Sequence, residues 1–298
     1  MKEILKRLPR EGAQRAASVP DNLWVRCPRC KELQYTKEHE QSLKVCSKCK
    51  YHWPLTARER IDATLDAGTF REIDAGMHSS DPLHFSSRGE VYGDKLEQYA
   101  RQTGAAESFI YGTGAVDGQS LVFGVTEFGF AGGSMGAVFG EKLTRAIELA
   151  RRELLPLVVV SSGGGARMQE GTISLLQMAK TVAALDRFKA AGLPFLSVMA
   201  DPCLGGMTAS YAILGDVNIA EPGAYIGFAG RRVIEQTMRQ KLPQNAARAE
   251  FLLEHGMIDI VVARAELPSL LGRLVRLLAT SNPAVARRRG RVEQHAGV

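Results

Sequence analysis

The chain has 298 residues, of which 45% are hydrophobic and 23% charged, and it carries a net charge of +6. This composition is typical of a soluble globular protein with a sizeable core. No apolar run approaches the roughly 20 residues that a membrane-spanning helix needs, and the start, Met1–Arg7, has no continuous apolar segment of a secretory signal. The sequence therefore predicts a cytoplasmic protein with no membrane partner.

Much of the positive charge lies at the two ends of the chain. Residues 1–20 are predicted to be a basic leader, and residues 281–298 a basic tail, both without regular periodicity. The excess charge favours an anionic partner, but it does not choose among nucleic acid, a phosphorylated cofactor and an acidic protein.

Residues 21–56 form a compact module with two close pairs of cysteines. The pairs have C-x₂-C spacing and are fifteen residues apart: Cys27, Cys30, Cys46 and Cys49. This is the spacing of a Cys₄ zinc ribbon, and four thiolates leave no open position on the metal, so the predicted Zn²⁺ is structural. His39 and His52 are alternative ligands, although four well-spaced cysteines make them unnecessary.

The next predicted element is an amphipathic helix from Thr56, with Glu59 at the capping-box position. A polar stretch over residues 78–107 is expected to be helix and loop. The segments Tyr111–Val116 and Ser120–Glu127 flank Asp117-Gly118, which predicts a β-hairpin.

After this hairpin, strands, glycine-rich turns and helices alternate, which indicates an α/β architecture with ligand sites where the strands end. The predicted order is a glycine-rich turn at 132–136, a helix over Glu141–Glu153, a strand over Leu157–Val160, a turn at Gly163–Gly165, a helix over Met168–Lys189, a strand over Pro194–Ala200, a loop over Asp201–Gly206, a helix over Met207–Leu214, strands over Asp216–Ala220 and Ala224–Phe228, and helices to about Leu278.

Two of these turns, Gly163–Gly165 and Gly205–Gly206, can point backbone N–H groups into open space. Such groups stabilise an oxyanion or a phosphate without using a side chain. The pattern predicts an anion-stabilising site but does not identify its ligand.

Several motifs resemble those of biotin-dependent carboxyltransferases. The most specific is Gly164–Gly171, with the sequence G-G-A-R-M-Q-E-G. Further segments of the same kind are Gly132–Gly136, Gly140–Lys142, Gln177–Lys180, Asp201–Ser210, Ile226–Thr237 and Ala249–Asp259. With the Cys₄ module in front, their order is similar to the beta-subunit family of multi-subunit acetyl-CoA carboxylase, from about Leu23 to Leu278.

This resemblance implies a crotonase-like spiral of ββα units over residues 57–280. It implies transfer of a carboxyl group from carboxybiotin to acetyl-CoA, forming malonyl-CoA for fatty-acid synthesis. The implied partners are a homologous alpha subunit in an alpha2beta2 assembly, the biotin carboxyl carrier protein and biotin carboxylase. Biotin and ATP would belong to those partners, because the chain has no Met-Lys-Met biotinylation site and no recognisable ATP-binding segment.

The resemblance also suggests roles for individual residues. It assigns the oxyanion N–H groups to Gly164 and Gly165, and it makes four residues candidates for the CoA side: Gly205, Gly206, Arg167 and Arg231. For Arg167 a second interpretation stays open, in which it pairs with Glu170 and holds the loop.

Three positions depart from the family pattern. Gly163 stands where Ser is more frequent, Cys203-Leu204 replaces a Thr pair, and Arg231 replaces Pro. The first change is expected to loosen the loop, the second leaves any hydroxyl role there in doubt, and the third adds a charge near the expected CoA site.

Three other functions remain as alternatives. Gly132–Gly136 also matches the G-x-S-x-G elbow of α/β-hydrolases, with Asp201 and His255 following in the right order. The ribbon and the basic ends would suit a nucleic-acid-binding protein. The carboxyltransferase half of a malonate decarboxylase is a closer relative, but it is not expected to carry the ribbon.

Overall fold

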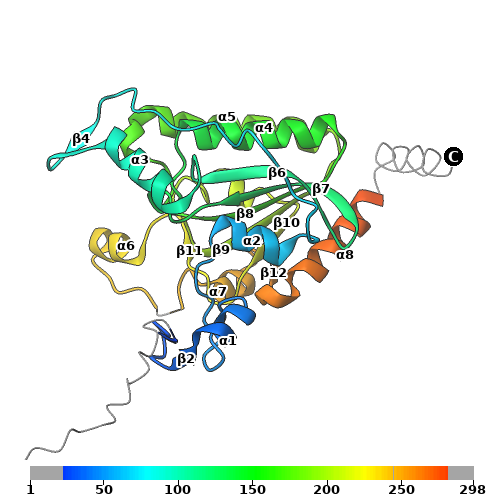
Figure 1. Ribbon diagram of the computed structural model, residues 1–298, viewed down its shortest axis with the longest axis horizontal. Helices are drawn as coiled ribbons and strands as arrows, with labels where there is room; N and C mark the ends of the chain where they lie inside the picture. The colour runs from blue at the N-terminus through cyan, green and yellow to red at the C-terminus, as the bar shows by residue number, and fades with distance from the viewer. Residues whose placement is uncertain (1–22, 244, 281–298) are drawn as a thin grey trace, which may run out of the picture.

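The computed structural model describes residues 23–243 and 245–280, so the predicted leader and tail lie outside the described residues. The described part is built on a mixed eight-stranded sheet in the order β12-β10-β9-β8-β7-β6-β3, with β11 also paired to β9 (Figure 1). Strands β7 to β12 along this path are parallel, whereas β6 and β3 are antiparallel. The strands of the sheet are β3 (Arg71–Ile73), β6 (Phe109–Val116), β7 (Gln119–Thr126), β8 (Leu157–Gly163), β9 (Phe195–Leu204), β10 (Val217–Ala220), β11 (Ile226–Gly227) and β12 (Ile260–Val261).

Helices cover both faces of this sheet (Figure 1). The longer helices are α2 (Ala57–Thr64), α3 (Tyr92–Thr103), α4 (Ala137–Arg152), α5 (Gly171–Ala190), α6 (Arg231–Met238) and α8 (Leu267–Thr280). Side chains alternate along β8, so Val159 packs with α4 and α5 while Val158 and Val160 pack with α2 and α8. The predicted α/β fold is confirmed, because helices cover both faces of a largely parallel sheet.

The predicted hairpin and capping box are both present. Asp117 and Gly118 turn the chain between β6 and β7, and the Asp66 carboxylate accepts both of their N–H groups at 3.0 and 2.9 Å. Thr56 accepts from the Glu59 N–H, and the Glu59 carboxylate accepts from the Thr56 N–H, at the start of α2. The capping box and the strand pairing of the hairpin are determined locally, because their partners lie nearby in the chain, whereas Asp66 is a distant addition to the turn.

Other predicted boundaries are wrong. The expected helix at Met207–Leu214 is a series of turns ending in the 3₁₀ turn η3 (Tyr211–Ile213), since this segment bonds to a neighbouring one through the Thr208 hydroxyl and the Gly227 carbonyl at 2.9 Å. Strand β9 continues through most of the expected loop at Asp201–Gly206. The remaining short elements are β4 (Ser86–Ser87), β5 (Glu90–Val91), α7 (Ala249–Glu254), η1 (Ala131–Gly133), η2 (Met168–Glu170) and η4 (Arg264–Glu266).

The cysteine-bearing module packs against one end of the sheet body. It contains β1 (Trp24–Arg26), β2 (Leu33–Tyr35) and α1 (Thr36–Gln41). Its main link to the body is Arg264, whose guanidinium donates to the carbonyls of Leu43 at 2.6 Å and Trp53 at 2.9 Å. The Arg264 N–H also donates to His52 Nε2 at 3.3 Å. The module is therefore fixed to the body by buried polar contacts.

Behind this link lies a buried ion triad. The Glu221 carboxylate accepts from Arg60 at 2.6 Å and from Arg264 at 2.8 Å, and all three side chains are at most 4% exposed. Burial by itself raises the pKa of Glu221, but the two guanidinium groups outweigh it and leave the pKa well below its usual range. Glu221 is therefore ionised at neutral pH and holds two arginines, from α2 and from the segment before α8.

We expect Glu221→Gln to destabilise the protein by about 3 kcal/mol at pH 7, because it leaves two buried cations without a counter-charge. The folded-state pKa of Glu221 is depressed, so its stabilisation is present above about pH 4.5 and is lost as the pH falls. Urea unfolding of both proteins from pH 7 to pH 3 measures this. The difference between them should shrink in acid, and a constant difference would contradict the assignment.

Candidate functional site

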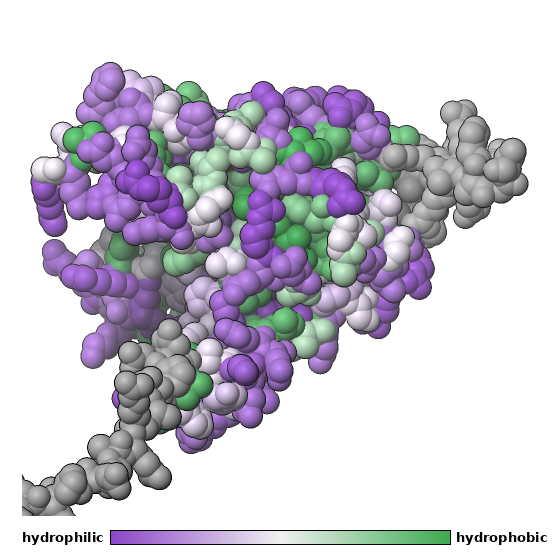
Figure 2. Space-filling model, in the orientation of Figure 1, coloured by the Kyte–Doolittle hydropathy of each residue, from purple (hydrophilic) through white to green (hydrophobic). Residues whose placement is uncertain are grey.

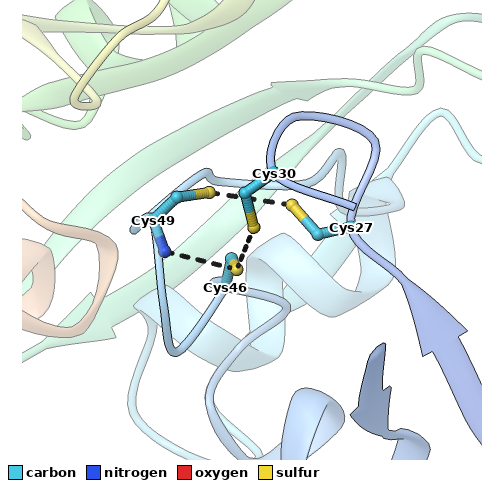
Figure 3. A group of neighbouring side chains, drawn as sticks. All are labelled: Cys27, Cys30, Cys46 and Cys49. Carbon is cyan, nitrogen blue, oxygen red and sulfur yellow. Dashed lines mark hydrogen bonds between the residues drawn. The ribbon is translucent and has the colours of Figure 1, made fainter. Parts of the chain in front are cut away.

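The four module cysteines converge on one point. Figure 3 shows their side chains turned toward a common centre, and the sulfur atoms all lie within 4.8 Å of one another. The Cys27–Cys49 and Cys30–Cys46 sulfur distances are both 3.7 Å. A tetrahedral site with Zn–S bonds of about 2.3 Å has sulfur–sulfur edges of about 3.8 Å, so the arrangement fits zinc.

The pKa values of the thiols also favour a bound cation. Burial raises the pKa of Cys27, but the backbone N–H groups of Cys30 and Arg29 outweigh it and bring the pKa down to about 6. Burial and the neighbouring thiols raise the pKa of Cys49 to about 12. One thiolate therefore forms readily, while a full set of four needs a cation to offset their mutual repulsion.

The two histidines of the module have other contacts. The His39 ring packs on Trp53 with ring centroids 4.3 Å apart. His52 has Nδ1 2.9 Å from the Lys50 carbonyl, and its Nε2 accepts from Arg264. Neither belongs to the metal-competent group found among the described residues. The four cysteines are thus the complete candidate ligand set.

The two glycine turns meet at the ends of two parallel strands. Gly163 of β8 is in register with Cys203 of β9, so the two parallel strands end at the same edge of the sheet. Gly165 has φ +101°, and a Cβ there would lie 2.8 Å from the Gly206 nitrogen. A Cβ on Gly205 would lie 3.2 Å from Gly165 Cα. The backbones are in direct contact, which only glycine permits.

The hydrogen bonds of these turns show which N–H groups are available. The Gly164 N–H donates to the Gly132 carbonyl at 3.1 Å, and that of Gly205 donates to Gly227 at 3.0 Å. The expectation that Gly164 supplies an oxyanion N–H is therefore corrected, because this donor is already used. Within residues 23–243 and 245–280, the amides of Gly165 and Gly206 donate to no protein acceptor. They are adjacent and belong to different turns.

Arg167 lies in the interior, so the expectation of a CoA contact from it is also corrected. Its side chain is 0% exposed and forms ion pairs with Glu107 and Glu170. The interpretation in which it holds the loop fits these contacts. Glu107, Ser79 and Tyr92 belong to the same polar cluster. They were missed because their sequence positions lie far from the glycine motif.

The remaining candidates have clear structural surroundings. The Arg231 guanidinium donates to the carbonyls of Leu242 at 2.8 Å and Pro243 at 2.5 Å, and so ties α6 to the segment after it. A Cβ on Gly163 would lie 2.5 Å from the Gly133 carbonyl oxygen. The loop is therefore closed tightly around this glycine, contrary to the expected loosening. Cys203 is fully buried in the core.

The hydrolase alternative lacks its hydrogen-bond relay. The Ser134 hydroxyl donates to the Ala131 carbonyl at 2.8 Å and accepts from Arg167 at 3.1 Å. The Asp201 carboxylate accepts from the Tyr225 N–H, and the His255 ring stacks on a neighbouring phenylalanine. Among the residues that the structure describes, no hydrogen bond joins Ser134 to Asp201 or His255, so G-x-S-x-G here is not a nucleophile elbow.

Comparison with known proteins identifies the family. Residues 54–265 match the carboxyl transferase domain. The chain is 53% identical over 270 residues to acetyl-coenzyme A carboxylase carboxyl transferase subunit beta 2 of Roseiflexus sp. (strain RS-1), covering 91% of this chain and 89% of that protein. It is 48% identical to the beta subunit of Chloroflexus aurantiacus (strain ATCC 29366 / DSM 635 / J-10-fl), covering 98% and 97%. The chain belongs to this family of carboxyltransferase beta subunits.

Solved structures extend the likeness at the level of the fold. Transcarboxylase 12S, with methylmalonyl-coenzyme A bound, superposes with a TM-score of 0.63 at 23% identity, over 82% of this chain and 43% of that one. A Pseudomonas malonate decarboxylase hetero-tetramer gives a TM-score of 0.59 at 27% identity, over 76% and 82%. Within the described residues, no helix of this carboxyltransferase-family chain is both long and apolar enough to cross a membrane.

We expect the purified protein to bind about one zinc per chain through the four clustered cysteines. Cys46→Ser should lower the zinc content close to zero and reduce the melting temperature, because it removes one ligand of the tetrahedron. Cys203→Ala, at a buried cysteine outside the module, is the matched control and should keep its zinc. Elemental analysis measures both. A wild-type protein without zinc, whose thiols all react under native conditions, would contradict the site.

Proposed function

We propose that the chain is the beta half of the carboxyltransferase of a multi-subunit acetyl-CoA carboxylase. In this function it transfers the carboxyl group of carboxybiotin, carried by the biotin carboxyl carrier protein, to acetyl-CoA and forms malonyl-CoA. Its high identity to beta subunits over nearly their full length supports this function. The structural observation that carries the proposal is the pair of unused backbone donors at Gly165 and Gly206.

These donors suit the chemistry of a thioester enolate. When a proton leaves the methyl group of acetyl-CoA, negative charge develops on the thioester oxygen. Two fixed N–H groups facing that oxygen lower the barrier, because they need no reorganisation as the charge forms. Biotin, when present on its carrier, supplies the carboxyl group and, by the mechanism that the family resemblance implies, the base. The chain itself then needs to bind and polarise the thioester.

We assign the CoA side to the surface where the two turns open. Gly164 is exposed, and a Cβ there would meet nothing closer than the Gly132 carbonyl oxygen at 3.9 Å. Phe228 is 75% exposed, and its carbonyl oxygen lies beside Gly205. Gly205 and these neighbours offer backbone and apolar surface to the thioester arm, and Gly206 is buried next to them. Arg231 contributes by holding α6 in place at the edge of this surface.

The proposal includes a partner that completes the site. Apolar side chains lie exposed along the start of α5 and its preceding turn, including Met168 at 84% and Leu176 at 61%. In the view of Figure 2, hydrophilic residues line most of the outline, with hydrophobic residues between them toward the middle. We infer that a homologous alpha subunit covers the apolar face, in an alpha2beta2 assembly that also works with biotin carboxylase. Four clustered, unbridged cysteines support a reducing, cytoplasmic compartment.

Two further functions are secondary. Trp24 is 60% exposed beside Tyr35 on the ribbon, which would allow contact with a nucleic acid. Affinity that falls steeply with added salt would support such binding. The malonate decarboxylase alternative has only 27% identity behind it, against 53% for the acetyl-CoA carboxylase relatives. Measuring whether the complex uses acetyl-CoA or free malonate as its substrate distinguishes the acetyl-CoA carboxylase function from the malonate decarboxylase function.

We expect Gly165→Ala to lower kcat for carboxyl transfer by a factor on the order of 10²–10³, the effect typical of losing one oxyanion donor. Its Cβ would push the Gly206 backbone away, and φ +101° is strained for alanine. Gly118→Ala, in the hairpin turn at φ +70° with no atom within 4 Å of the added Cβ, controls for backbone strain and should keep its kcat. Gly164→Ala should also retain most activity. Normal turnover in Gly165→Ala would remove the turn from the mechanism.

We further expect the isolated chain to be almost inactive and the activity to appear on adding the alpha subunit. Gly165 and Gly206 are themselves buried but lie beside the exposed Gly164, and catalysis by fixed dipoles needs a partner to exclude water from that opening. Reverse transfer from malonyl-CoA to a biotin analogue should be followed with each subunit alone and with both. Full activity from this chain as a monomer would show that the site is not shared.

A further inference from the structure

Arg167 is buried among an unusual number of polar partners. Its side chain is among the largest fully buried ones in the described part of the chain. Every nitrogen of the guanidinium donates to at least one acceptor. These acceptors are the Ser134 hydroxyl and carbonyl, the hydroxyls of Ser79, Tyr92 and Ser108, and the carboxylates of Glu107 and Glu170.

The acceptors come from segments that are distant in the sequence. Ser79 precedes the β4–β5 hairpin, Tyr92 begins α3, Glu107 lies just before β6, and Ser134 lies in the turn before α4. A planar guanidinium with five N–H donors, some shared between two acceptors, can reach all of them, whereas a lysine ammonium has three donors and a single centre. The cluster therefore depends on arginine in particular.

Electrostatics keeps this cluster ionised. Burial raises the pKa of Glu107, but the Arg167 guanidinium outweighs it and holds that pKa below its usual range. Burial lowers the pKa of Arg167, and Glu107 and Glu170 more than reverse this, so its pKa is raised. Removing the cation would leave two carboxylates buried without a counter-charge, which is costly.

The cluster is joined directly to the proposed oxyanion donors. The Arg167 N–H donates to the Met135 carbonyl at 3.0 Å, and the Met135 N–H donates to the Gly165 carbonyl at 2.8 Å. The Arg167 side chain meanwhile holds Ser134, next to Met135, with a hydrogen bond of 2.7 Å to its carbonyl. Glu170 accepts from the Ala137 N–H at 2.5 Å and so caps α4. The Gly163–Gly165 turn is therefore tied to this cluster through Met135.

The structure assigns to Arg167 the role of a positioning residue, which holds Gly165 at its carbonyl through Ser134 and Met135 and so fixes the direction of the Gly165 N–H toward the thioester oxygen. This assignment rests on the proposed carboxyltransferase function and deepens it. Arg167 does not touch the substrate, since its side chain has no exposed surface. Its contribution is the fixed geometry of the donors, and a displacement of about 1 Å at a reacting centre can cost about 10²-fold in rate.

The test compares Arg167→Lys with Arg264→Lys in the complex with the alpha subunit. Both arginines are buried and paired with carboxylates, but Arg264 lies at the ribbon and not at the glycine turns. We expect Arg167→Lys to lower kcat by roughly 10- to 100-fold with KM for acetyl-CoA changed less than about twofold, because the donors act on the transition state. Arg264→Lys should lower the melting temperature while kcat stays within about twofold.

Tyr92→Phe provides a milder variant if Arg167→Lys does not fold. It removes the hydroxyl that bonds to Arg167 and Glu170 and keeps the ring. We expect kcat to fall roughly three- to tenfold, again without a change in KM. The proposal is overturned if Arg167→Lys, or in its absence Tyr92→Phe, keeps the wild-type kcat, or if KM rises in step with the loss of kcat/KM.

A second readout separates this proposal from the proposed function. Amide hydrogen exchange should speed up at Gly164, Arg167 and Met135 in Arg167→Lys or Tyr92→Phe, and stay unchanged there in Arg264→Lys. If exchange is faster in the variants but the wild-type complex transfers no carboxyl group, the proposed carboxyltransferase function is rejected and the positioning role of Arg167 is kept. If exchange is unchanged in the variants and the wild-type complex is active, only the positioning role of Arg167 is rejected.

Discussion

The proposed site depends on direct backbone contact between two glycine turns at the ends of β8 and β9. Parallel pairing brings Gly163 level with Cys203, and the chains then leave the sheet at the same edge. Because Gly165 and Gly206 have no side chains, their peptide groups can lie against each other with N–H groups unused inside the protein. Any side chain in this contact would separate the two donors, so the proposed chemistry requires glycine at both positions.

Two buried arginine clusters hold the structure on either side of this contact. Arg167, with Glu107 and Glu170, joins the turns to the segments before α4 and β6. Arg264, with Glu221 and Arg60, joins the cysteine module to the sheet body. In both, burial disfavours the charges and close pairing with complementary charges restores them. Each cluster is stable only when complete, which fixes the relative positions of segments that the sheet does not connect.

Local signals predicted much of the fold. The capping box at Thr56, the Asp117-Gly118 hairpin and the strand at β8 occupy the predicted segments because their determining contacts lie within a few residues. The helix expected at Met207–Leu214 failed where the fold brings the Gly227 carbonyl to the Thr208 hydroxyl. The division at residues 56 and 57 stays a prediction, since the module and the body share the contacts of Arg264.

The sequence by itself determined the family, the four cysteines and the glycine turns, because each is written in short motifs with fixed spacing. It could not decide which glycine N–H groups are free. That depended on Gly132 and Gly227, whose carbonyls are placed by tertiary packing and take the N–H groups of Gly164 and Gly205. Nor could it show that Arg167 is buried, since its partner Glu107 is sixty positions away. Hydrogen bonds and burial are properties of three-dimensional proximity, and only the tertiary structure establishes them.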